Sequence, residues 1–284
     1  MKKYFILLLI AFTACRTSAP YVKTPSNLST HLSPGSSIYP MISIHRGGGE
    51  TPNYPENCLE SFQHFAKMMP SIIECDIAMS LDSVLYLMHD NTLERTTTGS
   101  GKIQEKSWEY IKTLQLKDNF GTLTPYKVPT LMETLKWGKN KVLFTLDVKR
   151  GTPFKKVIDE VVRTKSENNS IIITYNATDA KTVYDLHPGL MISVTIMKVE
   201  DYERLNALGI PDKNMVAFIG THEPKAELIE FLHSKGIPTI LGVLGNLDKK
   251  AAAQGNKVYK NYIDLGVDIL STDRPEAVYS VIKP

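Results

Sequence analysis

Eight short apolar runs, separated by longer amphipathic segments, constrain the fold of this chain more than any other feature. The runs cover residues 41–45, 72–78, 142–148, 171–175, 191–195, 215–219, 239–243 and 268–272. Helical periodicity falls between most of them, at 58–69, 130–137, 154–164, 177–186, 199–208, 225–235 and 249–265, with a last short helix after Pro275. Strict alternation of strand and helix favours a parallel sheet, and eight units favour a closed (β/α)8 TIM barrel. We therefore predict one α/β domain over residues 41–284.

An open, doubly wound sheet is the alternative architecture for alternating strands and helices. Such a sheet usually has a glycine-rich first turn that leads directly into a helix. Here Gly47-Gly48-Gly49 is followed by a proline-containing loop instead, which favours the barrel.

One connection is too long for a simple barrel. Residues 91–127 separate the second strand region from the next barrel helix, and they include several aromatic side chains. Long structured insertions often cover a functional site, and a small decorative subdomain is the competing interpretation.

The first forty residues have the pattern of an exported, anchored protein. Lys2 and Lys3 precede an apolar run at 5–12, which is too short to span a bilayer as a helix. Small residues then lead to Cys15, so we predict a lipoprotein signal peptide over 1–15, with lipid attached to Cys15. An ordinary secretory signal with an incidental cysteine is the alternative. Residues 16–40, rich in Ser, Thr and Pro, are expected to form a flexible tether. The expected location is the periplasm, outer membrane or cell surface of a bacterium.

Composition narrows the range of partners. The net charge is +3, charged residues make up 22% of the chain, and no basic stripe stands out, so we expect no nucleic-acid partner. Beyond Cys15 only Cys58 and Cys75 remain, which is too few for a disulfide framework. We interpret both as buried free thiols, with pairing as the alternative.

Polar residues end the second and third strands, where a barrel places its active site. Alternation puts Glu74 and Asp76 on one face of the second strand, and Asp147 and Lys149 on one face of the third. Buried carboxylates of like charge need a counter-ion. An oxygen-rich set of this kind suits Ca²⁺, Mg²⁺ or Mn²⁺ rather than Zn²⁺. A salt bridge to Arg46 or to a lysine is the competing explanation.

Two histidines flank this predicted metal site. His45 and Arg46 end the first strand, and His89 follows shortly after the second. Two histidines beside a metal and basic side chains fit acid–base phosphoryl chemistry, whereas a lone histidine more often makes a structural hydrogen bond.

Six short blocks resemble the glycerophosphodiester phosphodiesterases in order and spacing. They are His45-Arg46-Gly47, Pro55-Glu56-Asn57, Glu74-Cys75-Asp76, His89-Asp90 with Leu93-Glu94-Arg95-Thr96-Thr97, Leu146-Asp147-Val148-Lys149, and Ser271-Thr272-Asp273-Arg274-Pro275. The resemblance extends from about residue 41 to the end of the chain. Together the first five blocks are specific, because their chance assembly is improbable.

The resemblance implies a role for each residue of these blocks, in a barrel acting on a small phosphodiester. His45 and His89 would be the acid–base pair, and Glu74, Asp76 and Asp147 would hold one divalent cation, Ca²⁺ or Mg²⁺, with Mn²⁺ also acceptable. Arg46 and Lys149 would grip the phosphate, and Glu56 and Asn57 would shape the first loop of this phosphate site. In this family the neighbouring glycerol hydroxyl is thought to attack first, giving a cyclic phosphate that water opens.

The chain departs from the family pattern at two places. Asp147 stands where the family usually has Glu, which withdraws the carboxylate by about one C–C bond. The family also tends to have a Trp near the end of the seventh strand, where this chain has residues 241–246 without an aromatic. A choline-type cation favours an aromatic face, so the sequence gives less support for a substrate with a choline-type headgroup.

Three other functions compete with glycerophosphodiester hydrolysis. One is hydrolysis of another diester, of the phosphoinositol or lysophospholipid type. The second is a non-catalytic ligand-binding lipoprotein, although a binder needs no pair of histidines. The third, a glycosidase, fits poorly, because carboxylates two residues apart on one strand cannot flank a sugar at the usual separation of roughly 5–9.5 Å.

Overall fold

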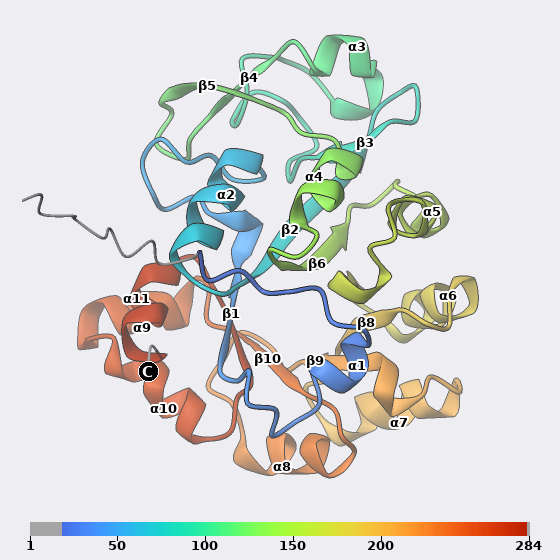
Figure 1. Cartoon of the computed structure of the whole chain (residues 1–284), viewed down its shortest axis with the longest axis vertical. Coiled ribbons are helices and arrows are strands. Elements are labelled where there is room, and N and C mark those ends of the chain that lie inside the picture. The colour runs from blue at the N-terminus through green and yellow to red at the C-terminus, as the bar shows by residue number, and fades with distance from the viewer. Residues whose placement is uncertain (1–18, 283–284) are drawn as a thin grey trace, which may run out of the picture.

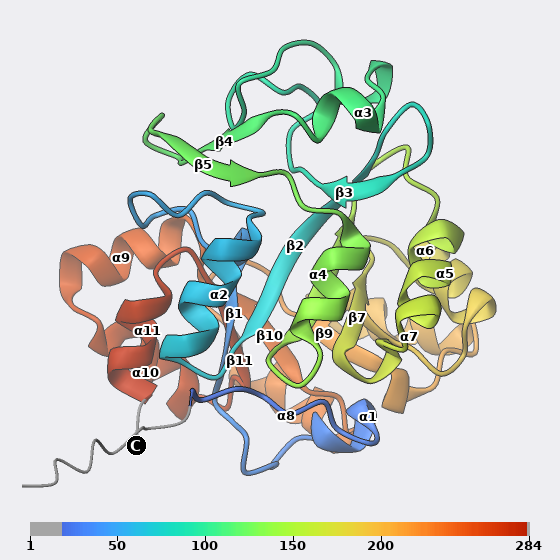
Figure 2. The same cartoon turned by 45° about the horizontal axis from the view of Figure 1, so that its top comes forward.

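Eight parallel strands close into a barrel in the computed structural model, which describes residues 19–282. Strand β1 pairs with both β2 and β11, which closes the sheet and confirms the (β/α)8 prediction (Figures 1 and 2). The barrel strands are β1 (Met41–Ile44), β2 (Ile72–Met79), β6 (Leu143–Val148), β7 (Ser170–Ile173), β8 (Met191–Thr195), β9 (Met215–Phe218), β10 (Thr239–Gly242) and β11 (Ile269–Thr272).

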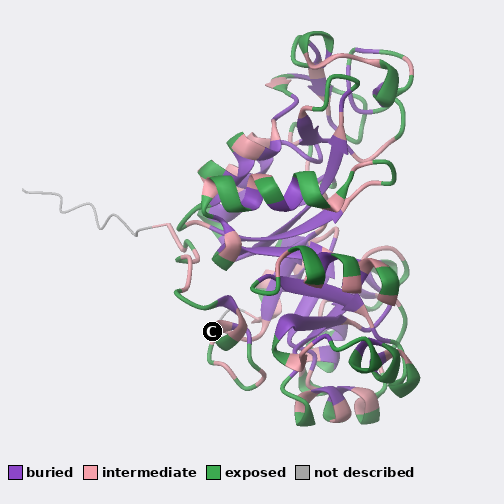
Figure 3. Ribbon diagram, turned by 90° about the vertical axis from the view of Figure 1, so that its right-hand side faces the viewer, coloured by how far each residue is buried: buried purple, intermediate pink, exposed green. Residues whose placement is uncertain are grey.

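The helices form the outer layer of the barrel. They are α2 (Leu59–Met68), α4 (Leu131–Gly138), α5 (Phe154–Thr164), α6 (Ala177–Leu186), α7 (Val199–Ala207), α8 (Ala226–Ser234), α9 (Asn246–Gln254), α10 (Lys257–Asp264) and α11 (Pro275–Ile282). The strands are buried, whereas the helices expose their outer sides (Figure 3). The single helix predicted over 249–265 is divided into α9 and α10 at Gly255, whose φ of +96° a helix cannot continue.

The side chains inside the barrel form layers. The lowest layer, at the amino ends of the strands, is entirely apolar: Met41, Ile72, Leu143, Ile171, Met191, Val216, Ile240 and Ile269. Two residues further along, four of the strands instead have small hydroxyl side chains, Ser43, Thr145, Ser193 and Ser271. Barrel interiors are usually filled by bulky branched residues. The small hydroxyl side chains instead leave a cavity of about 250 Å³ above the apolar layer.

The insertion predicted over 91–127 belongs to a small structured layer at the carboxyl ends of the barrel strands. This layer begins earlier than predicted, with β3 (Leu85–Leu87), which pairs antiparallel with β2. The 3₁₀ turn Ile103–Glu105, α3 (Trp108–Ile111) and the antiparallel pair β4 (Gln115–Lys117) and β5 (Leu123–Lys127) follow. Its own apolar core contains Tyr86, Leu93, Ile103, Ile111 and Leu116, and this core extends to Cys58 at the start of α2.

The segment before β1 differs from the flexible tether predicted for 16–40. Within its described part, residues 19–40, the helix α1 (Leu28–His31) inserts Leu28 and Leu32 against the apolar layer at the amino ends of the strands. Their exposed fractions are 3% and 0%. The segment thus closes the lower end of the barrel, because apolar strand ends there would otherwise face water.

The signal peptide predicted over 1–15, and Cys15 with it, lies outside the described residues. None of the helices within residues 19–282 is long and apolar enough to cross a membrane. Cys58 and Cys75 are buried free thiols, as expected.

Candidate active site

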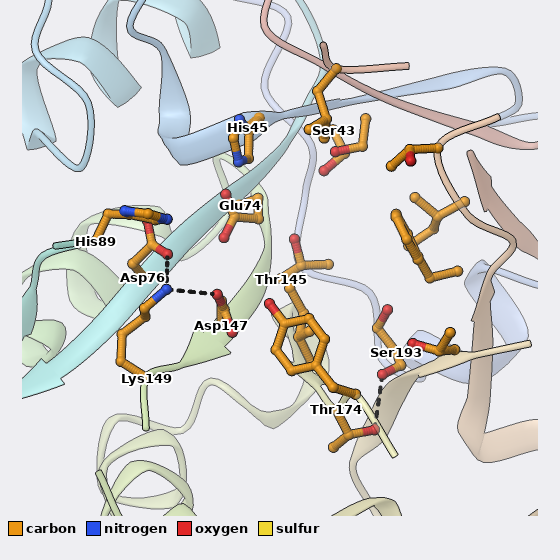
Figure 4. A pocket seen from close by; sticks show the side chains of 18 residues that line it. Ser43, His45, Glu74, Asp76, His89, Thr145, Asp147, Lys149, Thr174 and Ser193 are labelled. Atoms are coloured by element: carbon orange, nitrogen blue, oxygen red, sulfur yellow. Dashed lines mark hydrogen bonds and ion pairs between the residues drawn. The ribbon is translucent and has the colours of Figure 1, made fainter. Parts of the chain in front are cut away.

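Three carboxylates meet at the carboxyl ends of two neighbouring strands. Glu74 and Asp76 come from β2, and Asp147 of β6 is the register partner of Asp76. One oxygen from each of the three lies within 4.8 Å of the others, and all three residues are buried. Ile73, Cys75 and Ile77 point outward to the helices, as strand alternation predicts. The carboxylates line the cavity together with Lys149 (Figure 4).

Burial and the charge of Asp76 disfavour the charged forms of Glu74 and Asp147. Burial raises the pKa of Glu74 to about 8, and the charge of Asp76 adds to the shift. Burial and Asp76 likewise raise the pKa of Asp147. The Oδ1 atom of Asp147 is buried without a hydrogen-bond partner among the described residues. A bound divalent cation would remove this repulsion and use the unpartnered oxygen, so the donor set fits a hard metal ion.

Lys149 is the cation nearest to the carboxylates. Its Nζ lies 3.3 Å from Asp76 Oδ1 and 3.4 Å from Asp147 Oδ2. Burial alone would lower the pKa of Lys149, but the charges of Asp76 and Asp147 outweigh burial and raise it. Lys149 therefore stays protonated at the cavity wall, where an anion can reach it.

Each of the two histidines is paired through Nδ1 with a carboxylate. His45 Nδ1 lies 2.7 Å from Asp273 Oδ1, and His89 Nδ1 lies 2.8 Å from Asp90 Oδ1. Burial would lower the pKa of His45, but the hydrogen bond with Asp273 and the nearby charge of Glu74 offset burial and raise it. With Nδ1 occupied by a carboxylate, Nε2 of each ring is the nitrogen available to a substrate. Both histidines line the cavity.

The loop after β1 is held in an unusual backbone conformation. Arg46 has φ of +51°, and its backbone N–H donates to Glu74 Oε2 at 2.6 Å. Its guanidinium contacts Glu56 at 3.1 Å, while its Nε is buried without a hydrogen-bond partner among the described residues. A positive φ is costly for a side chain as large as Arg and persists only where surrounding contacts impose it.

Glu56 and Asn57 support this site without lining the cavity. Glu56 has a side-chain exposure of 1% and turns its carboxylate to arginines. Asn57 Nδ2 donates to Asp76 Oδ2 at 2.7 Å, and its Oδ1 accepts from the Asp76 backbone N–H at 2.9 Å. Arg46 also lies beside the cavity rather than in its wall. The two contacts of Asn57 fix the direction of the Asp76 carboxylate.

Arg95, Asp90 and Asp273 belong to the site although sequence reasoning gave them no role. Arg95 donates to both oxygens of Glu56 at 2.8 and 2.9 Å and to both oxygens of Asp90 at 2.6 and 2.8 Å. A continuous chain of ion pairs thus connects His89 to Arg46 through Asp90, Arg95 and Glu56. The only signal in the sequence was their presence in the motif blocks, because Arg95 meets Glu56 across 39 residues and Asp273 meets His45 across 228.

Known proteins with similar sequences belong to one family of phosphodiesterases. The glycerophosphoryl diester phosphodiesterase family matches residues 45–277. The chain belongs to this family. A glycerophosphodiester phosphodiesterase from Caldanaerobacter subterraneus is 26% identical over 252 residues, which cover 86% of this chain and 98% of that protein.

Solved structures agree with the family assignment. A glycerophosphoryl diester phosphodiesterase from Parabacteroides distasonis is 29% identical, with a TM-score of 0.83 and 93% of each chain covered. A phosphodiesterase from Oleispira antarctica, solved in complex with the product sn-glycerol 3-phosphate, is 18% identical, with a TM-score of 0.68 and coverage of 87% of this chain and 98% of that one. At 18% identity, the similarity to the Oleispira protein shows a shared fold.

The structure also bears on the two departures from the phosphodiesterase pattern. The stretch that lacks the expected Trp contributes Leu244 to the cavity wall, but Phe218 of β9 and Tyr175 beyond β7 supply aromatic rings to the same wall. Tyr175 lines the cavity and also a wider groove of about 970 Å³ outside it, which is bounded by His89, Lys149 and Asp179. Sequence reasoning missed both aromatics, because neither lies in a motif.

Proposed function

We propose that this chain hydrolyses glycerophosphodiesters to an alcohol and sn-glycerol 3-phosphate. The observation that carries the proposal is the meeting of three buried carboxylates, a lysine and two carboxylate-bound histidines at one cavity. Membership of the family and the name of the Caldanaerobacter relative support the class of diester.

We infer that Glu74, Asp76 and Asp147 hold one divalent cation, Ca²⁺ or Mg²⁺, with Mn²⁺ as a further candidate. The raised pKa values of Glu74 and Asp147 and the unpartnered oxygen of Asp147 support this assignment. When bound, such a cation supplies positive charge to a nonbridging phosphate oxygen. Lys149 adds a second positive charge at the wall, and Arg46 adds a third beside the cavity, with its Nε 3.9 Å from Asp76 Oδ2.

His45 and His89 serve as the acid–base pair in this proposal. Asp273 and Asp90 keep a proton on Nδ1 of each ring, which leaves Nε2 to exchange a proton with the substrate. One ring takes the proton of the attacking hydroxyl, and the other gives a proton to the oxygen of the departing alcohol. After the first half of the reaction the two rings have exchanged protonation states, which suits the opening of a cyclic phosphate by water.

We further propose that the protein is exported and attached to a bacterial membrane by lipid on Cys15. The support is the sequence pattern of residues 1–15. Incorporation of a labelled fatty acid in a bacterial host, abolished by Cys15→Ser, is the expected result. Equal labelling of both forms would contradict this attachment site.

The reaction is tested by glycerol 3-phosphate release from a panel of glycerophosphodiesters, with EDTA and with added Ca²⁺, Mg²⁺ or Mn²⁺. We expect release that EDTA removes and one of these ions restores. His89→Ala should abolish turnover while the protein stays folded. A best substrate that yields a different phosphorylated product, or unchanged turnover of His89→Ala, would contradict the proposal.

A further inference from the structure

We propose that the lower end of the barrel docks onto an anionic lipid surface, so that the catalytic cavity opens away from the membrane. We call this end the floor face. It consists of residues 19–40 and the loops that lead into β6, β7, β9 and β10. The proposal goes beyond the hydrolytic reaction, and one of its supports is the proposed lipid on Cys15.

Lysines gather on the floor face. Four stand in the loops that enter barrel strands: Lys139 before β6, Lys165 before β7, Lys213 before β9 and Lys235 before β10, and all four are exposed. Lys23 of the N-terminal segment is exposed as well. The acidic residues of these loops, Glu167 and Asp212, are fewer and only half-exposed. A cluster of lysines attracts anionic lipid headgroups.

Hydrogen bonds place these loops around the N-terminal segment. Val22 N–H donates to Lys141 O at 2.9 Å, Asn168 Nδ2 donates to Ser26 O at 3.1 Å, and Ser29 Oγ donates to Lys213 O at 2.6 Å. The loops before β6, β7 and β9 therefore share one surface with residues 22–29.

Exposed apolar side chains lie at the same end of the molecule. Met68 ends α2, Leu186 ends α6, Leu208 follows α7 and Leu265 follows α10, with exposed fractions of 39–43%. Each helix runs back against its preceding strand, so all four side chains lie at the amino ends of the strands. Apolar side chains interleaved with lysines are typical of surfaces that enter the headgroup region of a bilayer.

The position of the N-terminus independently favours this orientation. The chain is fixed to the floor face from Val22 onward. Seven residues separate Val22 from Cys15, so even a fully extended chain spans at most about 25 Å. A lipid on Cys15 would therefore hold the floor face close to the bilayer. The insertion lies at the opposite end of the strands (Figure 2), and the cavity is lined by residues of that end, such as His45, His89 and Lys149.

The floor face can be tested without the lipid, in a chain of residues 19–284. This chain contains every element of the described fold, including the segment that closes the barrel. Co-sedimentation with phosphatidylcholine vesicles, with and without phosphatidylglycerol, measures the partition coefficient. The floor variant combines Lys139→Glu, Lys165→Glu, Lys213→Glu and Lys235→Glu.

A matched control makes the same charge change in the insertion, at Lys102, Lys106, Lys112 and Lys127. We expect the floor variant to bind anionic vesicles at least about tenfold more weakly and the control to change less than about twofold, because each lysine near an anionic surface favours binding several-fold. Both variants should stay folded and keep their hydrolysis of a soluble substrate, measured on the same samples. A small drop in Tm is expected in both, because Lys139, Lys165 and Lys235 stand at helix carboxyl ends and Lys102 and Lys112 are in ion pairs.

Two outcomes would overturn the proposal. One is a loss of binding in the insertion variant alone. That result would indicate that the insertion, with its exposed Phe120 and Leu123, faces the membrane together with the cavity. The other is wild-type binding that is no stronger to anionic than to neutral vesicles. An absence of hydrolysis in all samples would refute the proposed reaction and leave the comparison of binding intact.

Discussion

Arg95 is expected to couple the stability of the first loop to the rate of the reaction. Its guanidinium is the sole bridge between the Asp90 that holds His89 and the buried Glu56, among the described residues. The Arg95→Ala variant removes four hydrogen bonds at once. Its consequences differ for the two carboxylates, because Glu56 is buried and Asp90 is a quarter exposed.

The loss of stability can be worked from these contacts. Breaking a buried ion pair costs about 3–5 kcal/mol when the remaining charge has no partner. Glu56 keeps Arg46 at 3.1 Å, so its share is smaller, and the exposed contact with Asp90 adds at most about 1 kcal/mol. We expect Arg95→Ala to lower the free energy of unfolding by about 2 kcal/mol.

The effect on turnover should fall on kcat. Without Arg95, Asp90 is free to turn away from His89, and a correctly placed acid or base contributes about 10²–10⁴-fold to the rate. We expect kcat to fall by about tenfold or more with little change in KM, because Arg95 does not line the cavity. Arg95→Lys should be intermediate, since an ammonium keeps the charge but cannot hold two carboxylates in a planar fork.

Urea unfolding and steady-state kinetics of the same protein give both numbers. Lys155→Ala is the control, because its ion pair with Asp159 lies on the surface of α5, with both side chains more than half exposed, and should contribute at most about 0.5 kcal/mol. An Arg95→Ala variant that keeps its stability within about 0.5 kcal/mol and its kcat within about twofold would refute this reasoning.

Three further changes test other parts of the fold. Leu32→Ala should lower the free energy of unfolding by about 2–5 kcal/mol in urea, because Leu32 is fully buried. A decrease below about 0.5 kcal/mol would instead support a flexible tether. Gly47→Ala should destabilise by more than about 2 kcal/mol and lower activity, because the added Cβ would lie 1.8 Å from Phe62 at a φ of +65°; wild-type values for both would contradict this. The pKa of His233 is raised by its hydrogen bond with Asp268, so this pair stabilises the fold fully below the unfolded pKa of about 6.5 and less as pH rises through the folded pKa. His233→Gln should therefore lower Tm more at pH 5.5 than at pH 8.5, and an equal loss at both would count against the ion pair.

Sequence periodicity predicted the barrel and the inward carboxylates because both depend on local alternation. Glu74, Asp76 and Asp147 had to share one face, and the register of β2 with β6 then brought them together. Motif spacing placed His45 and His89 near the same rim. These features need only neighbouring residues in the chain and the direction of the strands.

Contacts between distant segments could not be predicted in the same way. Residues 19–40 have the composition of a linker, yet the apolar pair Leu28 and Leu32, four residues apart, covers the open end of the barrel. The four-residue spacing of Leu28 and Leu32 was the available signal of a short helix with one apolar side. The residues around them do not indicate which surface that side contacts. The roles of Arg95 and Asp273 likewise depend on partners 39 and 228 residues away.

We propose above that Glu74, Asp76 and Asp147 hold a cation on which diester hydrolysis depends. The most direct measurement is glycerol 3-phosphate release by EDTA-treated protein as one divalent cation is added back, for the wild type and for Asp147→Asn. We predict saturable recovery in the wild type, and recovery in the variant only at cation concentrations about tenfold higher or more. Full activity in EDTA, or the same cation dependence in both proteins, would contradict the account.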